Sequence, residues 1–213
     1  MCTTREQLGA EGEICFASPT SIQNVFIWKK RPCTVLLIKK LGDELIPHLV
    51  EMALWLHEEG YNVIVELSDY EDLVNMLPFL YTFEPSDELD LARMVDVVVC
   101  LGGDGVILHA ASLFPLASPP LISFSLGSLG FLTTFDFEDF RQDLSRVLTV
   151  NETVYVTLRL RLHAQVLRNG VPIEGKSYNV LNEVWICCSS FVGFMAHRLN
   201  SLLRVWFVFA GCN

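Results

Sequence analysis

A glycine-rich turn that carries an acid is the strongest candidate for chemistry in this 213-residue sequence. Gly102, Gly103, Asp104 and Gly105 follow directly after an apolar, β-branched run at 95–101. Glycines let a backbone approach a phosphate closely, and the N–H groups that open a following helix attract an anion. A carboxylate there can orient a sugar hydroxyl and accept its proton. We predict a phosphoryl-transfer site at Asp104, with a tight structural turn as the weaker alternative.

A second glycine turn, SLGSLGFL at 125–132, follows the next predicted strand and includes Gly130 and Phe131. Because the carboxyl ends of parallel strands meet at one edge of a sheet, the two turns are expected to form one cleft there. The Phe131 ring is available to pack on a base or ribose face. The pattern alone favours a core position for this ring.

A third match is GVPIEGKS at 170–177, which satisfies the phosphate-binding expression G-x-x-x-x-G-K-[ST]. That loop functions between a buried strand and a helix. Here an amphipathic strand precedes the match and a β-rich segment follows it, while Asn169 and Gly170 form a hairpin turn signal. We interpret the match as a coincidence.

The elements that must position the two glycine turns alternate between short apolar strands and amphipathic helices. Strands are predicted at 34–38, 61–65, 95–101 and 121–124, and helices at 44–59, 106–113 and 137–147. The segment 69–93 is acidic and ambiguous. This order predicts an α/β fold with a Rossmann-like parallel sheet.

The hydrophobic period changes to two at 154–166, which indicates a half-buried antiparallel strand, and 178–184 can return as its hairpin partner. An all-β domain is therefore expected to begin near residue 150. The predicted organisation is a flexible N-terminal extension (1–32), an α/β nucleotide-binding domain (33–149), a partial β domain (150–184) and an atypical hydrophobic tail (185–213).

The charge distribution excludes some classes of partner. The net charge is −10, and 43–104 holds fifteen acids but one base, so binding to nucleic acid is not expected. The longest run of the tail without Lys, Arg or His, 184–196, is shorter than the roughly 20 residues that a membrane helix requires. No membrane span is expected.

The cysteines and histidines indicate the compartment and argue against a metal site. The seven cysteines are odd in number and widely spaced, with no secretory signal before them, so reduced thiols in a cytoplasmic protein are predicted. The cysteines and the five histidines lack ligand spacing, so no protein-bound metal is predicted.

Five motifs together resemble the eukaryotic cytosolic NAD kinases in order and spacing. They are CLGGDG at 100–105, SLF at 112–114, PP at 119–120, LGSLGFL at 126–132 and LNEV at 181–184. GGDG alone is shared with lipid kinases and phosphofructokinases, whereas LGSLGFL discriminates against the diacylglycerol and sphingosine kinases. The resemblance covers residues 34–184.

The resemblance implies ATP-dependent phosphorylation of the adenosine ribose 2′-hydroxyl of NAD, which gives NADP. NAD and ATP are the implied ligands, with Mg²⁺ or another divalent cation on the triphosphate, and a homo-oligomer stays open. Asp104 matches the proposed base. The residues that match nucleotide-binding positions are Gly102, Gly103, Gly105, Gly130, Phe131, Asn182 and Glu183.

Two departures from the family pattern leave alternatives open. Val106 replaces the threonine that usually follows GGDG, and nothing after Val184 resembles the family's second domain. The alternatives are a non-catalytic, truncated NAD kinase and, with less support, a lipid kinase.

Overall fold

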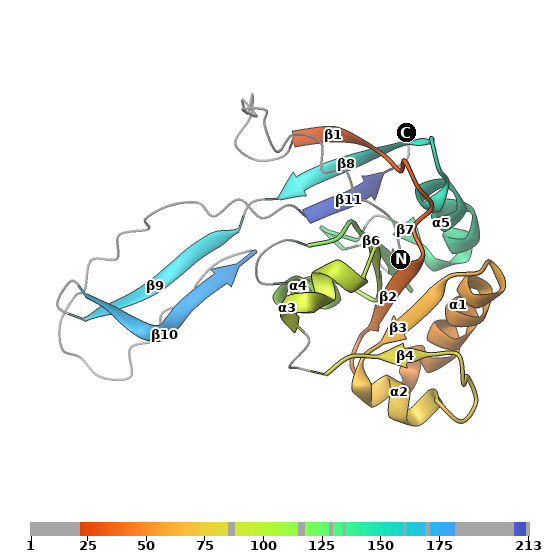
Figure 1. The fold of residues 1–213 in the computed structure, drawn as a ribbon, viewed down its shortest axis with the longest axis horizontal. Coiled ribbons are helices and arrows are strands. Elements are labelled where there is room, and N and C mark those ends of the chain that lie inside the picture. Colours follow the sequence, from red (N-terminus) through yellow and green to blue (C-terminus); the bar gives the residue numbers. More distant parts are fainter. Residues whose placement is uncertain are drawn as a thin grey trace.

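The fold centres on a nine-stranded sheet whose middle strands are parallel, as the sequence predicts (Figure 1). The computed structural model describes residues 22–84, 88–114, 118–127, 130–133, 135–159, 161–168, 171–181 and 207–211. The parallel strands are β2 (Thr34–Lys39), β3 (Asn62–Val65), β4 (Tyr81–Thr82), β5 (Val97–Leu101) and β6 (Leu121–Ser125), in the order β6-β5-β2-β3-β4. β7 (Phe135–Asp136) adds a short parallel pairing to β6.

Helices bury both faces of the sheet, which explains why its strands are almost continuously apolar. In β2, Val35 and Leu37 belong to one buried cluster, and Leu36 and Ile38 belong to the other. α1 (Ile46–Glu58), α2 (Leu67–Leu73) and α5 (Phe140–Leu148) contribute to the first cluster, while α3 (Glu88–Met94) and α4 (Asp104–Ser112) contribute to the second. Short 3₁₀ turns, η1 (Asp43–Leu45) and η3 (Phe137–Asp139), precede α1 and α5.

Three further strands extend the sheet beyond β6 and correct the predicted organisation. β1 (Ile22–Ile27) pairs antiparallel with β8 (Thr153–Arg159), and β11 (Phe207–Gly211) lies between β8 and β6. The predicted extension 1–32 is therefore too long at its C-terminal end. Trp28 confirms this, because it is 2% exposed and its indole N–H donates to the Val147 carbonyl at 2.7 Å.

The predicted β domain also changes. Its first strand, β8, belongs to the central sheet, and only the following hairpin stands apart from it. β9 (Leu162–Arg168) pairs antiparallel with β10 (Val171–Val180) in a separate two-stranded sheet. The hydrophobic period could not show that the chain passes from one sheet to another near Arg161, because both strands alternate in the same way.

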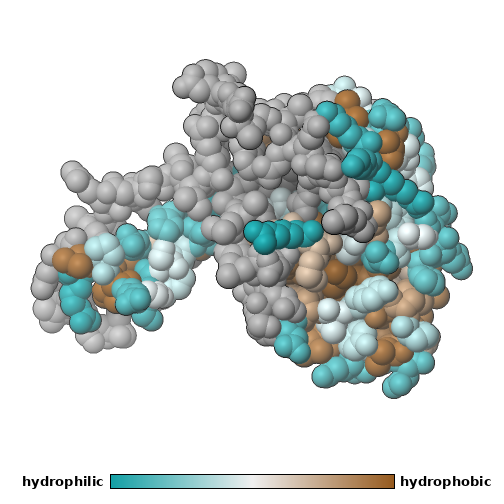
Figure 2. Space-filling view, viewed as in Figure 1, coloured by the Kyte–Doolittle hydropathy of each residue, from teal (hydrophilic) through white to brown (hydrophobic). Residues whose placement is uncertain are grey.

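The hairpin projects from the body of the molecule and carries exposed apolar side chains (Figure 2). Val166, Val171 and Tyr178 are all more than 40% exposed. Lys176 and Ser177, the end of the third glycine-containing match, lie within β10, so they are part of a strand and do not begin a helix. The interpretation of that match as a coincidence is confirmed.

The tail departs from its prediction in one segment. The sequence of 185–213 has no strand pattern, yet β11 forms an inner strand of the sheet. Backbone pairing with β8 and β6 holds this segment in an extended conformation. Among the described residues, no helix is long and apolar enough to cross a membrane.

Candidate active site

The first glycine turn lies at the carboxyl edge of the parallel sheet, between β5 and α4. Backbone hydrogen bonds fix its first residue: the Gly102 N–H donates to the Phe124 carbonyl of β6, and the neighbouring Lys40 N–H donates to the Leu101 carbonyl, both at 2.9 Å. Gly102 has a positive φ of +131°, and a Cβ there would lie 2.9 Å from Val106 Cγ2. Glycine is therefore required at this position.

The second glycine turn holds the Asp104 carboxylate directly. The Phe131 N–H donates to Oδ2 at 3.0 Å, the Leu132 N–H donates to Oδ1 at 2.9 Å, and the Thr133 hydroxyl donates to Oδ1 at 3.1 Å. The prediction that the two turns lie together is confirmed. Thr133 was not among the predicted site residues, because no motif marks a single threonine one residue beyond the glycine turn.

Gly130 makes this contact sterically possible. A Cβ on Gly130 would lie 2.2 Å from Asp104 Oδ1 and 3.1 Å from the Thr133 hydroxyl oxygen. No real side chain tolerates such a separation from a fixed carboxylate. Gly103 and Gly105, by contrast, have nothing within 4 Å of an added Cβ, so their surroundings are open on the side where a ligand could approach.

The environment keeps Asp104 ionised at neutral pH. Burial is the largest single influence and acts to raise the pKa, but the hydrogen bonds from Leu132, Thr133 and Phe131 together lower the pKa below the ordinary aspartate value. Asp104 also begins α4, where the helix dipole favours negative charge. The carboxylate is thus a good hydrogen-bond acceptor and a weak base.

Phe131 lies on the surface, contrary to the core position that its pattern favours. Its side chain is 84% exposed, beside the carboxylate that its backbone N–H contacts. An exposed ring next to an ionised acid is available to stack on a planar ligand. The Arg159 guanidinium lies over this ring at 5.7 Å from the centroid.

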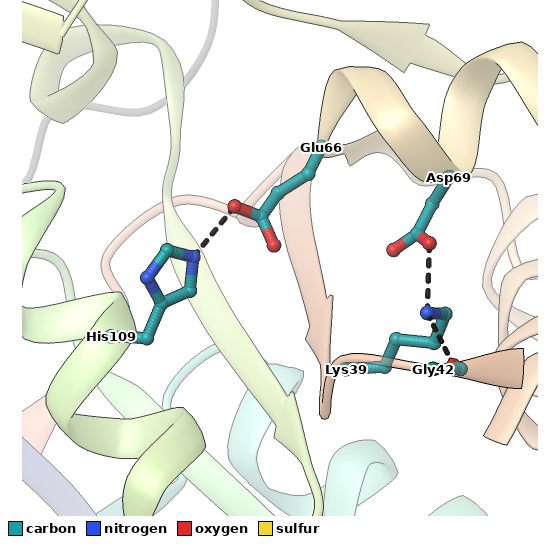
Figure 3. A network of polar contacts seen from close by, with 5 residues as sticks. All are labelled: Lys39, Gly42, Glu66, Asp69 and His109. Atoms are coloured by element: carbon teal, nitrogen blue, oxygen red, sulfur yellow. Dashed lines mark hydrogen bonds and ion pairs between the residues drawn. The ribbon is translucent and has the colours of Figure 1, made fainter. Parts of the chain in front are cut away.

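A polar network occupies the same edge of the sheet, beyond the glycine turns (Figure 3). Lys39 Nζ forms a buried ion pair with Asp69 at 2.9 Å and donates to the Gly42 carbonyl at 2.9 Å. Glu66, after β3, contacts His109 Nε2 of α4 at 2.6 Å. Sequence reasoning missed these pairs, although a lysine that ends a buried strand is a signal that an acid must lie nearby.

The remaining predicted residues fall into two groups. Asn182 and Glu183 lie outside the described residues. Val106 is 6% exposed and packs against the Gly102 turn, so the position of the usual threonine is filled by an apolar side chain that cannot cap α4.

The described cysteines are reduced, and the described acids form no cluster of metal ligands. Cys33 and Cys100 are free thiols, and burial, followed by the charge of Glu66, raises the Cys100 pKa so that this thiol stays protonated. Within the described ranges there is no cluster of three or more His, Cys, Asp or Glu residues that could hold a metal ion.

The α/β part of the chain matches the model of a known protein family. Residues 35–153 match the model of the ATP-NAD kinase N-terminal domain, which is more than half of the chain. The chain belongs to the NAD kinase family. The described α/β architecture and the following antiparallel hairpin agree with this membership.

Individual members of the NAD kinase family are similar over most of this chain. "Probable NAD kinase 2, chloroplastic" from rice is 50% identical over 187 residues, 85% of this chain, and "NAD kinase 2, chloroplastic" from Arabidopsis thaliana is 50% identical over 188 residues. The chain spans 19% of the length of each. The crystal structure of yeast NADH kinase complexed with NADH superimposes with a TM-score of 0.62 at 30% identity, over 74% of this chain and 46% of that one.

The names of these plant relatives correct one prediction. The cysteine pattern and the resemblance to cytosolic NAD kinases predicted a cytoplasmic protein, but the two relatives at 50% identity are chloroplastic. The prediction was wrong because reduced cysteines exclude oxidising compartments without distinguishing the cytosol from a plastid.

Proposed function

We propose that this chain transfers the γ-phosphoryl group of ATP to the 2′-hydroxyl of the adenosine ribose of NAD, giving NADP. The observation that carries the proposal is the Asp104 carboxylate, which three donors of the 131–133 turn hold ionised at the carboxyl edge of the sheet. Ligands bind at this edge in parallel α/β sheets. Membership of the NAD kinase family supports the reaction.

Asp104 would act mainly by orienting the acceptor hydroxyl. A carboxylate with a lowered pKa accepts a strong hydrogen bond but draws a proton away weakly. Phosphoryl transfer passes through a loose transition state in which positioning and charge stabilisation dominate, so early proton removal is not required. The proton would pass to Asp104 as the new oxygen–phosphorus bond forms.

The glycines and Phe131 would form the nucleotide contacts. The open surroundings of Gly103 and Gly105, at the start of α4, allow phosphate oxygens to reach backbone N–H groups. The exposed Phe131 ring would stack on the base or ribose of NAD. Asn182 and Glu183 would contact the nucleotide from the segment after β10.

The residues present fit a divalent cation that arrives with ATP. Mg²⁺ is commonly held by one or two carboxylates together with substrate phosphates and water, and Asp104 supplies a carboxylate at the glycine turns. The cation would neutralise charge on the triphosphate. The chloroplastic relatives support a plastid location for this activity.

The test is NADP formation from NAD and ATP with Mg²⁺ by the purified chain and by Asp104→Asn. Asp72→Asn, an exposed acid of α2, is the matched control. We expect activity in the parent and in the control, and a loss of about 10²-fold or more in Asp104→Asn. Equal rates in all three proteins would remove Asp104 from its role.

The same assay distinguishes the alternatives. A parent chain that binds nucleotide but forms no NADP would identify a non-catalytic member of the family. Phosphorylation of a diacylglycerol or sphingosine in place of NAD would favour the lipid kinase.

A further inference from the structure

Arg159 is a cation at the site that lies outside the five motifs at 100–105, 112–114, 119–120, 126–132 and 181–184. It is the last residue of β8, and its backbone is fixed by pairing with Phe207 of β11. Its side chain is partly buried, and Cζ lies 5.7 Å from the centroid of the Phe131 ring. Because the Phe131 N–H donates to Asp104 at 3.0 Å, one residue links the guanidinium to the carboxylate.

Charge connects the same two groups. Burial lowers the pKa of Arg159, and the Asp104 carboxylate acts in the opposite direction. An arginine stays protonated in such surroundings. A partly buried positive charge next to the acid is screened less by water than a surface charge, so its effect on a bound anion is stronger.

The chemistry of the proposed reaction places an anion near this cation. A hydroxyl bound to Asp104 would lie about 3 Å from a carboxylate oxygen, and the phosphorus that it attacks would lie about 3 to 3.5 Å further on. The transferring group therefore lies within roughly 6 to 7 Å of Asp104, the carboxylate whose charge acts on Arg159.

We propose that Arg159 binds the phosphoryl group that is transferred, with the Phe131 ring holding the guanidinium in place. This inference rests on the proposed function. The hydroxyl oxygen forms the new bond to the γ-phosphorus, the bond to the β,γ-bridging oxygen breaks, and ADP leaves. Arg159 neither gives nor takes a proton; its N–H groups bind the non-bridging oxygens, which a planar fork of donors matches well.

The experiment compares ATP with ADP, because only ATP carries the group in question. Titration calorimetry with Mg²⁺ measures both affinities for the parent, Arg159→Gln and Arg159→Lys, with Arg168→Gln, an exposed hairpin arginine, as control. We expect Arg159→Gln to lose at least tenfold in ATP affinity with ADP and NAD affinities changed less than twofold. Arg159→Lys should recover part of the loss, and the control should match the parent.

Kinetics give the second readout. Arg159→Gln is expected to lower kcat by about 10² or more while the KM for NAD stays within threefold, as for arginines that stabilise transferring phosphoryl groups. Thermal unfolding of each variant checks that the fold is retained.

The outcomes separate the two proposals. A parent that forms NADP while Arg159→Gln keeps the parental ratio of ATP to ADP affinity overturns the inference and leaves the function intact. An equal fall in ATP, ADP and NAD affinity also overturns it, since that pattern shows a structural support for Phe131. A parent that binds no nucleotide overturns both.

Discussion

The Asp104 carboxylate fills the space that a side chain at position 130 would occupy: a Cβ on Gly130 would lie 2.2 Å from Oδ1. Gly130 is therefore part of the hydrogen-bonded support of Asp104, because only glycine lets the 131–133 donors come within 3.1 Å. The second glycine turn is therefore in close-packed contact with the carboxylate of the first.

Gly130→Ala is expected to destabilise the chain by about 0.5–1.5 kcal/mol, the usual net contribution of a hydrogen bond, because the donors of Asp104 are exposed or only partly buried, and to abolish most activity. Urea unfolding measures the change. Because the clash is with the carboxylate, the same substitution should cost clearly less in an Asp104→Ala background. Additive costs in the double variant would contradict the contact.

Gly105→Ala is the matched stability control for that experiment. Gly105 lies in the first turn of α4 with nothing near an added Cβ. Alanine favours a helix over glycine by up to about 1 kcal/mol, so this variant should be as stable as the parent or more so.

The lowered pKa of Asp104 predicts a pH dependence of stability. A carboxylate whose pKa is lower in the folded state contributes stability above the unfolded value of about 3.9, and that contribution disappears as the pH falls through the folded value. Asp104→Asn lacks this contribution. The difference in free energy of unfolding between the two proteins should be constant from pH 5 to 7 and shrink below about pH 4. A difference that grows on acidification would contradict the lowered pKa.

The neighbouring residues Lys39 and Lys40 should respond differently to the same substitution. Lys39 Nζ pairs with an Asp69 carboxylate oxygen at 2.9 Å, and both side chains are 7% exposed. Lys40 Nζ lies 3.7 Å from a Glu44 carboxylate oxygen, and both of these side chains are mostly exposed. Lys39→Met leaves a buried carboxylate without its cation and should cost about 3–5 kcal/mol. Lys40→Met should cost less than about 1 kcal/mol. Lys39→Met combined with Asp69→Leu should recover most of the loss, and urea unfolding of all three variants checks this.

Trp28 tests where the folded part of the chain begins. Trp28→Ala should cost about 3–5 kcal/mol because it removes a large buried side chain, and Trp28→Phe should retain most of the stability apart from the hydrogen bond to Val147. Thermal unfolding measures both. An alanine variant as stable as the parent would show that Trp28 belongs to the N-terminal extension and not to the folded part of the chain.

The sequence predicted local features well where composition and period agree with the fold. The apolar runs of β2 and β5 are unambiguous because both faces are buried, and the glycine turns follow strands at the expected edge. The individual side-chain contacts between distant segments were not predictable. Nothing local shows that Asp104 accepts hydrogen bonds from residues 131–133, that Lys39 finds Asp69, or that Arg159 lies over Phe131, since each depends on the order of strands in the sheet.

The position of β11 between β8 and β6 has a consequence for biosynthesis. The last-made described strand lies inside a sheet whose other strands are translated earlier, so one edge of β8 and the Leu121 end of β6 leave the ribosome without their β11 partner. At about 5–20 residues per second, the chain between β8 and β11 takes seconds to synthesise. During that interval these strand edges are open to pairing with other chains.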